Sequence, residues 1–272
     1  MANPLLTAVS GMDAFQSWMN VIGNDIANVN TVGYKASEVN FANTLSQVMS
    51  SGSAGSTTGI GGTNPIQIGT GVQLNQVTPN FTQGGSDNTG NSSDLMISGN
   101  GLFALGATTT SPTPTEYTRA GNFTVDSSGY LVAPNGDYLL ASTTPGGTPD
   151  TAIDVGSNSY TIGQDGTITV NDGNTPPPTY YLSLANFPNP SGLTNAGTNM
   201  WTAPAGGNQG AVTYGQPGTG SIGTVQQGYL ESSNVDLTQE MSNMIQASTD
   251  YDGSSKLINT VQSMYQYMLQ QV

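Results

Sequence analysis

Acidic side chains are the first groups to consider for catalysis, because the sequence contains no histidine and no cysteine. Those absences remove imidazole bases, thiol nucleophiles and the usual nitrogen and sulfur metal ligands. Asp250 and Asp252 form the closest carboxylate pair on a predicted helix. Two residues apart, they point to nearly opposite sides of that helix and cannot share a proton. We therefore predict no catalytic pair at this position.

Two segments resemble parts of calcium-binding loops, namely Asp87-Asn-Thr-Gly90 and Asp126-Ser-Ser-Gly129. Both lack the further oxygen ligands and the terminal Glu of such loops, so we predict that both are turns. The glycine-rich stretches lack the lysine of a phosphate-binding loop. The sequence thus predicts no catalytic residue, no cofactor and no metal site, and we expect a protein that is not an enzyme.

The charge composition narrows the possible partners. Charged residues make up 7% of the chain, against about 25% in an ordinary soluble domain. Three basic residues and 17 acidic ones give a formal net charge of −14, which argues against nucleic acid and anionic membranes. Since neither a membrane-spanning apolar stretch nor a signal peptide pattern is present, we predict no membrane insertion and no cleaved signal peptide.

The ends of the chain have the periodicity of amphipathic helices. We predict one helix from about Leu5 to Val29, a second possible helical stretch over 36–49, and a helix of about 35 residues at the C-terminus. Ser232, Ser233 and Asn234 are suitable N-cap types for this last helix. Apolar side chains recur every three or four residues in both terminal helices. The predicted assembly interface consists of Leu5, Met12, Met19, Ile26, Leu237, Met241, Met244, Tyr251, Ile258, Tyr265 and Leu269.

This apolar seam has two interpretations that the pattern alone leaves open. It can close an intramolecular hairpin that joins the two termini, or it can join separate copies of the chain.

The middle of the chain is predicted to be β structure. Residues 50–62 form a loop or an extended arm, and from Ile66 onward short apolar runs alternate with turn signals. Asp165-Gly166 predicts a hairpin, and Pro176-Pro177-Pro178 marks an excursion from the sheet. The predicted fold class is α+β, with paired coiled-coil-like helices from the N- and C-termini and a mostly antiparallel β domain between them.

Motifs along nearly the whole chain resemble those of the bacterial flagellar rod and hook proteins, the axial protein family. The matching segments are Ser10-Gly-Met-Asp13, Val21 to Lys35, Ile66 to Gly71, Asp94 to Gly101, Tyr117 to Phe123, Leu184 to Trp201 and Gly228 to Leu237. Asp25 stands where this family usually has Asn. The three basic residues, Lys35, Arg119 and Lys256, lie inside or beside these motifs. Residues 60–64, 186–193 and 217–220 look most like hook proteins, with distal rod proteins second.

The resemblance implies a structural subunit of the flagellar hook, which polymerises into a hollow curved tube and acts as a flexible joint that transmits motor torque. A distal rod protein of the basal body is the alternative. The implied parts are a terminal-helix assembly domain (1–35 and 235–272), a connecting region (36–66 and 221–234) and a β-rich outer domain (67–220). The implied location is the extracellular flagellar appendage.

The partners that the resemblance implies are other copies of the chain, the rod and hook–filament junction proteins at the ends of the polymer, and the flagellar type III export apparatus. Two other classes stay open from composition. A secreted β-rich adhesin would explain the polar surface without explaining the helical seams. A carboxylate-dependent glycosidase would need two acids facing one cleft, and no spacing indicates such a pair.

Overall fold

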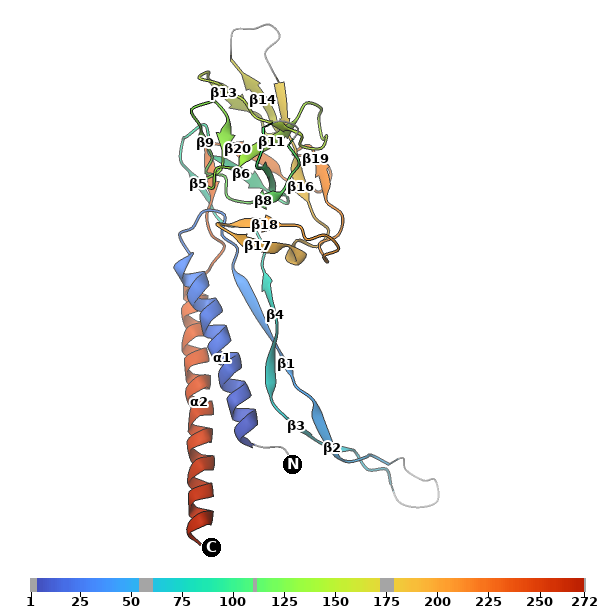
Figure 1. The fold of residues 1–272 in the computed structure, drawn as a ribbon, viewed down its shortest axis with the longest axis vertical. Helices are drawn as coiled ribbons and strands as arrows, with labels where there is room; N and C mark the ends of the chain where they lie inside the picture. Colours follow the sequence, from blue (N-terminus) through green and yellow to red (C-terminus); the bar gives the residue numbers. More distant parts are fainter. Residues whose placement is uncertain (1–3, 54–60, 110–111, 172–178, 272) are drawn as a thin grey trace. The chain divides into compact units, whose positions relative to one another are not determined.

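The computed structural model describes residues 4–53, 61–109, 112–171 and 179–271. The chain forms two compact units (Figure 1). Unit 1 comprises Met1–Ala27, Ser37–Pro79 and Asp236–Val272, and unit 2 comprises Asn28–Ala36 and Asn80–Val235. The chain therefore passes between the units at four places. The three-part division into assembly, connecting and outer regions concerns roles in a polymer and stays a prediction.

Unit 1 contains both α-helices, α1 (Pro4–Ala27) and α2 (Leu237–Gln270), which lie side by side (Figure 1). The expected helix at each end of the chain is confirmed, whereas a coiled-coil pairing of the two stays a prediction. Asp236 is the N-cap of α2, and its side chain accepts the backbone N–H groups of Thr238 and Gln239. The predicted caps at 232–234 precede this position. Asp236 takes the role because its carboxylate reaches two N–H groups of the first turn.

The predicted helical stretch at 36–49 is wrong, since these residues form β1 (Ser37–Asn43) and β2 (Ser46–Ser50). They pair antiparallel with β4 (Val72–Pro79) and β3 (Ile66–Gly69), respectively. Val39 and Phe41 favour extended backbone, and pairing with a partner strand outweighs the weak helical period. A bridge between Ser53 and Thr63 continues the β2–β3 ribbon as an arm. The remainder of the predicted loop or arm, 54–60, lies outside the described residues.

Unit 2 is built from short antiparallel strands, as the sequence predicts. Its largest sheet has the order β13-β14-β15-β11-β7-β8-β18-β17, in which β10 and β12 also pair with β11 and β9 pairs with β10. Three strand pairs, β16–β19, β20–β6 and β21–β5, complete the unit. The elements are β5 (Ser86–Asn88), β6 (Leu95–Ser98), β7 (Phe103–Gly106), β8 (Glu116–Thr118), β9 (Thr124–Val125), β10 (Leu131–Val132), β11 (Tyr138–Ser142), β12 (Thr151–Ala152), β13 (Tyr160–Ile162), β14 (Thr167–Val170), β15 (Thr179–Leu182), β16 (Leu184–Asn186), η1 (Pro190–Gly192), β17 (Thr194–Gly197), β18 (Met200–Thr202), β19 (Thr213–Gly215), β20 (Thr224–Gln227) and β21 (Tyr229–Glu231).

The predicted Asp165-Gly166 hairpin is confirmed, because β13 and β14 pair across it. Gly166 has φ +78°, which L side chains rarely adopt. The proline run at 176–178 lies outside the described residues.

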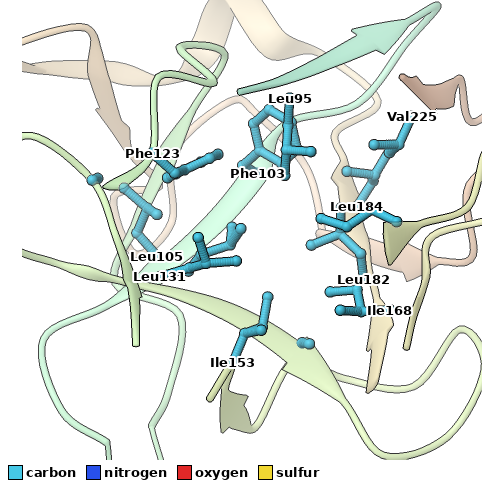
Figure 2. Packing of buried hydrophobic residues seen from close by; sticks show 14 of the residues in the cluster. Leu95, Phe103, Leu105, Phe123, Leu131, Ile153, Ile168, Leu182, Leu184 and Val225 are labelled. Atoms are coloured by element: carbon cyan, nitrogen blue, oxygen red, sulfur yellow. The ribbon is translucent and has the colours of Figure 1, made fainter. Parts of the chain in front are cut away.

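The core of unit 2 consists of two apolar clusters on opposite sides of β7. Phe103 and Leu105 belong to the larger cluster, shown in Figure 2, whereas Leu102 and Ala104 belong to the smaller one. Successive side chains of a strand point to opposite faces, so a continuous apolar run fills both clusters. Phe103 meets Phe123 edge to face, with ring centroids 5.3 Å apart. This core holds in place the strands of unit 2 that surround Lys35, Arg119 and Glu231.

Candidate assembly site

Small and polar residues predominate among the buried residues of the two helices of unit 1. The fully buried described residues are Ala8, Gly11, Ala14, Ile22 and Asp25 in α1 and Ala247 in α2. A Cβ atom on Gly11 would lie 3.3 Å from Ser254 Oγ of α2. Glu240, whose carboxyl interacts with that of Asp25, is seven residues before Ala247, and Ser254 is seven after it. These three residues therefore form one stripe of α2, and this stripe meets α1.

The predicted assembly residues lie beside this contact stripe. The partly buried ones are Leu5, Met12, Met19, Ile26, Tyr251 and Ile258. The exposed ones are Leu237, Met241, Met244, Tyr265 and Leu269, and Leu269 is 78% exposed. The α1–α2 contact thus leaves much of the predicted seam open, and its role between copies stays a prediction.

The β1–β4 hairpin packs against α1 within unit 1. Phe41 of β1 meets Phe15 and Trp18 of α1 edge to face, at ring-centroid distances of 6.2 Å and 5.8 Å. Ser10 Oγ accepts the N–H of Val72 at 3.3 Å. Gly71, with φ +145°, lies against Ser10 where a Cβ atom would collide with it. Two motifs of the resemblance, around Ser10 and Gly71, therefore form one helix–hairpin contact.

A buried cluster of three charged side chains lies in unit 2. Glu231, at the end of β21, accepts Lys35 Nζ at 2.8 Å and Arg119 Nε at 2.5 Å. Exposed fractions are 3% for Lys35, 4% for Arg119 and 0% for Glu231. Burial lowers the pKa of Lys35, and Glu231 opposes this shift. Truncating Glu231 would leave two buried positive charges without a counter-charge, whereas truncating Lys35 or Arg119 would leave one ion pair in place.

The cluster joins three motifs of the resemblance that are far apart in sequence. Sequence reasoning places Lys35 and Arg119 in such motifs but does not predict that they share Glu231. The one sequence feature that points to this cluster is the scarcity of basic residues, since two of the three in the chain bind one carboxylate. Charged side chains are rarely buried unless they are paired. In a chain with so few basic residues, each one is therefore a candidate for a buried structural or binding role.

The same region holds together the unit 2 segments that lead into unit 1. Asn234 accepts the N–H of Ala36 at 2.8 Å and donates to Asn80 O at 2.8 Å. Asn80 N donates to Ala36 O at 2.8 Å. The Glu231 carboxylate also accepts Gly84 N at 2.9 Å. Residues 35–36, 80–84 and 231–234 are therefore one hydrogen-bonded group at the chain passages to unit 1.

The candidate metal-binding segments have structural roles. Asp126 Oδ1 accepts the N–H groups of Ser128 and Tyr130, so the predicted turn is confirmed. Asp87 instead lies in β5 opposite Leu230, and the turn prediction is wrong there, since pairing with β21 extends this segment. Within the described ranges, no group of three or more acidic side chains could hold a metal ion. Neither described helix combines the length and apolar character needed to cross a membrane.

Three family models match the chain, at its two ends and in its β unit. They are the flagella basal body rod protein model over residues 5–35, the flagellar hook protein FlgE/F/G D1 domain over 96–170, and the flagellar basal body rod FlgEFG protein C-terminal model over 226–271. The first contains Lys35, the second Arg119 and the third Glu231. The three partners of the buried cluster thus come from three separately matched segments.

Curated relatives match over nearly the full length. The flagellar basal-body rod protein FlgG of Bacillus subtilis is 37% identical over 271 residues, which cover 99% of this chain and 98% of that protein. The protein of the same name from Caulobacter vibrioides is 37% identical over 96% of each chain. The flagellar hook protein FlgE of Borreliella burgdorferi is 44% identical over 125 residues, but these cover 46% of this chain and 27% of that protein. The chain therefore belongs to the flagellar rod and hook family of axial structural proteins.

Proposed function

We propose that this protein is a rod subunit of the flagellar basal body, the role that the motif resemblance gives as the alternative to the hook. The observation that carries this proposal is the near-complete match to proteins named basal-body rod protein. The hook protein matches less than half of the chain. The comparisons therefore favour rod over hook and reverse the order given by the short motifs. The proposed role is structural and not enzymatic, and the proposed location is a flagellar structure outside the cytoplasm.

The surface of α2 supports assembly into a polymer. Leu257, Met264, Met268 and Leu269 are all exposed in the single chain. Clustered apolar side chains on one helix are costly to leave in water and mark an interaction site. Neighbouring copies of the chain would cover them, with the terminal helices forming the inner wall of a tube. Unit 2 would form the outer part, as the domain prediction proposes.

The proposed mechanism is mechanical. The residue group 35–36, 80–84 and 231–234 connects the segments that enter unit 1, and it is cross-linked by hydrogen bonds and by the buried Lys35–Glu231 ion pair. A force on one of these segments would therefore pass to the others. Such a coupling suits a subunit that carries torque in a shaft.

Immunogold labelling of purified hook–basal bodies tests the proposal. Antibodies against this protein should label the straight rod after partial disassembly exposes it. Labelling confined to the curved hook would overturn the rod assignment. Antibodies absorbed beforehand with the purified protein provide the control for antibody specificity.

A further inference from the structure

A cavity of about 200 Å³ lies beside the buried charge cluster, within unit 2. Its polar lining includes Lys35, Arg119, Asn100 and Asn186, and its apolar lining includes Phe81 and Phe187. A lining that combines cationic groups with aromatic rings suits an anion with an apolar body.

The cluster carries a net charge that nothing within it balances. Lys35 and Arg119 contribute two positive charges and Glu231 one negative charge, and these side chains are 1%, 5% and 0% exposed. A buried charge without a counter-charge is costly. One additional negative charge in the cavity would neutralise the cluster.

Each cation also has one N–H group to spare. An ammonium has three donors and a guanidinium five. Lys35 donates to Thr82 O and Glu231 Oε1, and Arg119 donates to Glu231 Oε2, Gly101 O, Ile97 O and Gly99 O. In the part of the chain that the structure describes, one N–H of Lys35 Nζ and one N–H of Arg119 Nη1 therefore have no protein acceptor.

We propose that this cavity binds a carboxylate, with Lys35 and Arg119 donating one hydrogen bond each to it and Phe81 and Phe187 contacting its apolar part. A carboxylate supplies one negative charge and two oxygen atoms, which match the unbalanced charge and the two remaining donors. A phosphate would bring more charge than the cluster lacks. The binding site itself does not depend on the rod assignment. The source of the carboxylate is either a free small acid or an Asp or Glu of a second copy, and the second source rests on the proposed assembly.

Nuclear magnetic resonance of the lysine side chains provides a direct test, because the chain contains only two lysines, and Lys256 is exposed on α2. The probe is sodium benzoate, added to the unassembled full chain labelled with ¹³C at lysine Cε, with sodium chloride at equal ionic strength as reference. Benzoate should shift the Lys35 signal in a saturable manner and leave the Lys256 signal unchanged. Equal, non-saturating shifts of both signals, or no shift of either, would overturn the proposal.

Two variants extend this test. Asn100→Trp places a large side chain at an exposed residue that lines the cavity and leaves the charges intact. It should weaken benzoate binding by more than tenfold. Lys256→Met should bind like the unmodified chain. Unchanged binding in Asn100→Trp would contradict the assignment of this cavity.

An assembly measurement identifies the source of the carboxylate. If a second copy provides it, benzoate should slow polymerisation of the unmodified chain more than chloride does, and this difference should vanish in Asn100→Trp. Saturable binding without an effect on assembly would assign the site to free carboxylates. Failure of the rod assignment would leave the binding result on the unassembled chain untouched.

Discussion

Gly11 of α1 lies so close to Ser254 of α2 that a Cβ atom on the glycine would come to 3.3 Å from the serine Oγ. We predict that Gly11→Val destabilises the helix pair by about 1–3 kcal/mol, because the branched side chain would overpack this contact. Gly23→Ala is the matched control on the same helix, since nothing lies within 4 Å of a Cβ atom there. It should stabilise α1 by about 0.5–1 kcal/mol. Thermal melting of the helical circular dichroism signal measures both, and equal effects would contradict the contact.

Glu231→Gln should strongly destabilise unit 2. The substitution leaves Lys35 and Arg119 as buried positive charges without a carboxylate, and breaking a buried ion pair costs about 3–5 kcal/mol. Urea unfolding can follow this through the fluorescence of Trp201, which is buried in unit 2. A Trp18→Phe background removes the other tryptophan. Lys256→Met, on the surface of α2, should change the free energy of unfolding by less than about 0.5 kcal/mol.

The sequence predicts elements well where one local signal dominates. The terminal helices follow from sustained apolar periodicity, and the hairpin at Asp165-Gly166 follows from a residue pair that suits its turn. The segment 36–49 is different, because Val39 and Phe41 become strand residues only when β4 and α1 provide partners. Their partners in β4, Val77 and Leu74, are 38 and 33 residues away in sequence and leave no mark on local periodicity.

The candidate site was harder to predict for the same reason. Apolar periodicity indicates that α2 has a seam. It does not show that α1 contacts a different stripe of α2, which consists of Glu240, Ala247 and Ser254. Small residues permit a closer helix approach than Leu or Met, and this geometric effect does not appear in a hydrophobic pattern. The meeting of Lys35, Arg119 and Glu231 likewise depends on the fold of unit 2.

Alkaline pH should destabilise unit 2. Burial raises the pKa of Tyr117, Tyr160, Tyr180 and Tyr214 above the usual 10.0. The folded chain then keeps protons that the unfolded chain loses above pH 10.0, so this contribution is complete below pH 10.0 and declines as pH rises. The lowered pKa of Lys35 acts in the opposite direction. Its contribution to the free energy of unfolding increases with pH until the pH reaches 10.5, the pKa of lysine in the unfolded chain. Because four tyrosines lower the stability and one lysine raises it, we expect the net stability of unit 2 to fall as pH rises above 10.0.

Urea unfolding at pH 8 to 11, a range chosen to span tyrosine ionisation, measures this effect. Tyr214→Phe should reduce the loss, because the Tyr214 hydroxyl lies 2.9 Å from that of Tyr117 in a partly buried pair. Tyr265→Phe, which removes an exposed hydroxyl on α2, should leave the pH profile unchanged. A profile that is flat up to pH 11 in the unmodified chain would refute the prediction.

Mildly acidic pH should stabilise the helix pair through Glu240. Burial raises the pKa of Glu240, and the negative charges of Asp25 and Asp236 raise it further, whereas a hydrogen bond with Asn243 opposes the shift. A raised carboxyl pKa gives a contribution that is complete below the unfolded value of 4.5 and is lost as pH rises through the folded value. Asp25→Asn should therefore weaken the dependence of helix melting on pH between about 4 and 7. Asp13→Asn, exposed on the same helix, should preserve it.

Removal of the residues after Leu257 should abolish polymerisation and leave the melting of unit 2 nearly unchanged. The lost segment carries Met264, Tyr265, Met268 and Leu269, which are exposed in the single chain, and it contributes no strand to unit 2. Sedimentation of assembled material measures polymerisation, and Trp201 fluorescence reports on unit 2 in the same sample. A full-length chain with Ser263→Ala, on the same segment, provides the control and should polymerise normally. If the truncated chain formed normal polymers, the exposed apolar residues of α2 would not be assembly contacts, and the seam prediction would be wrong.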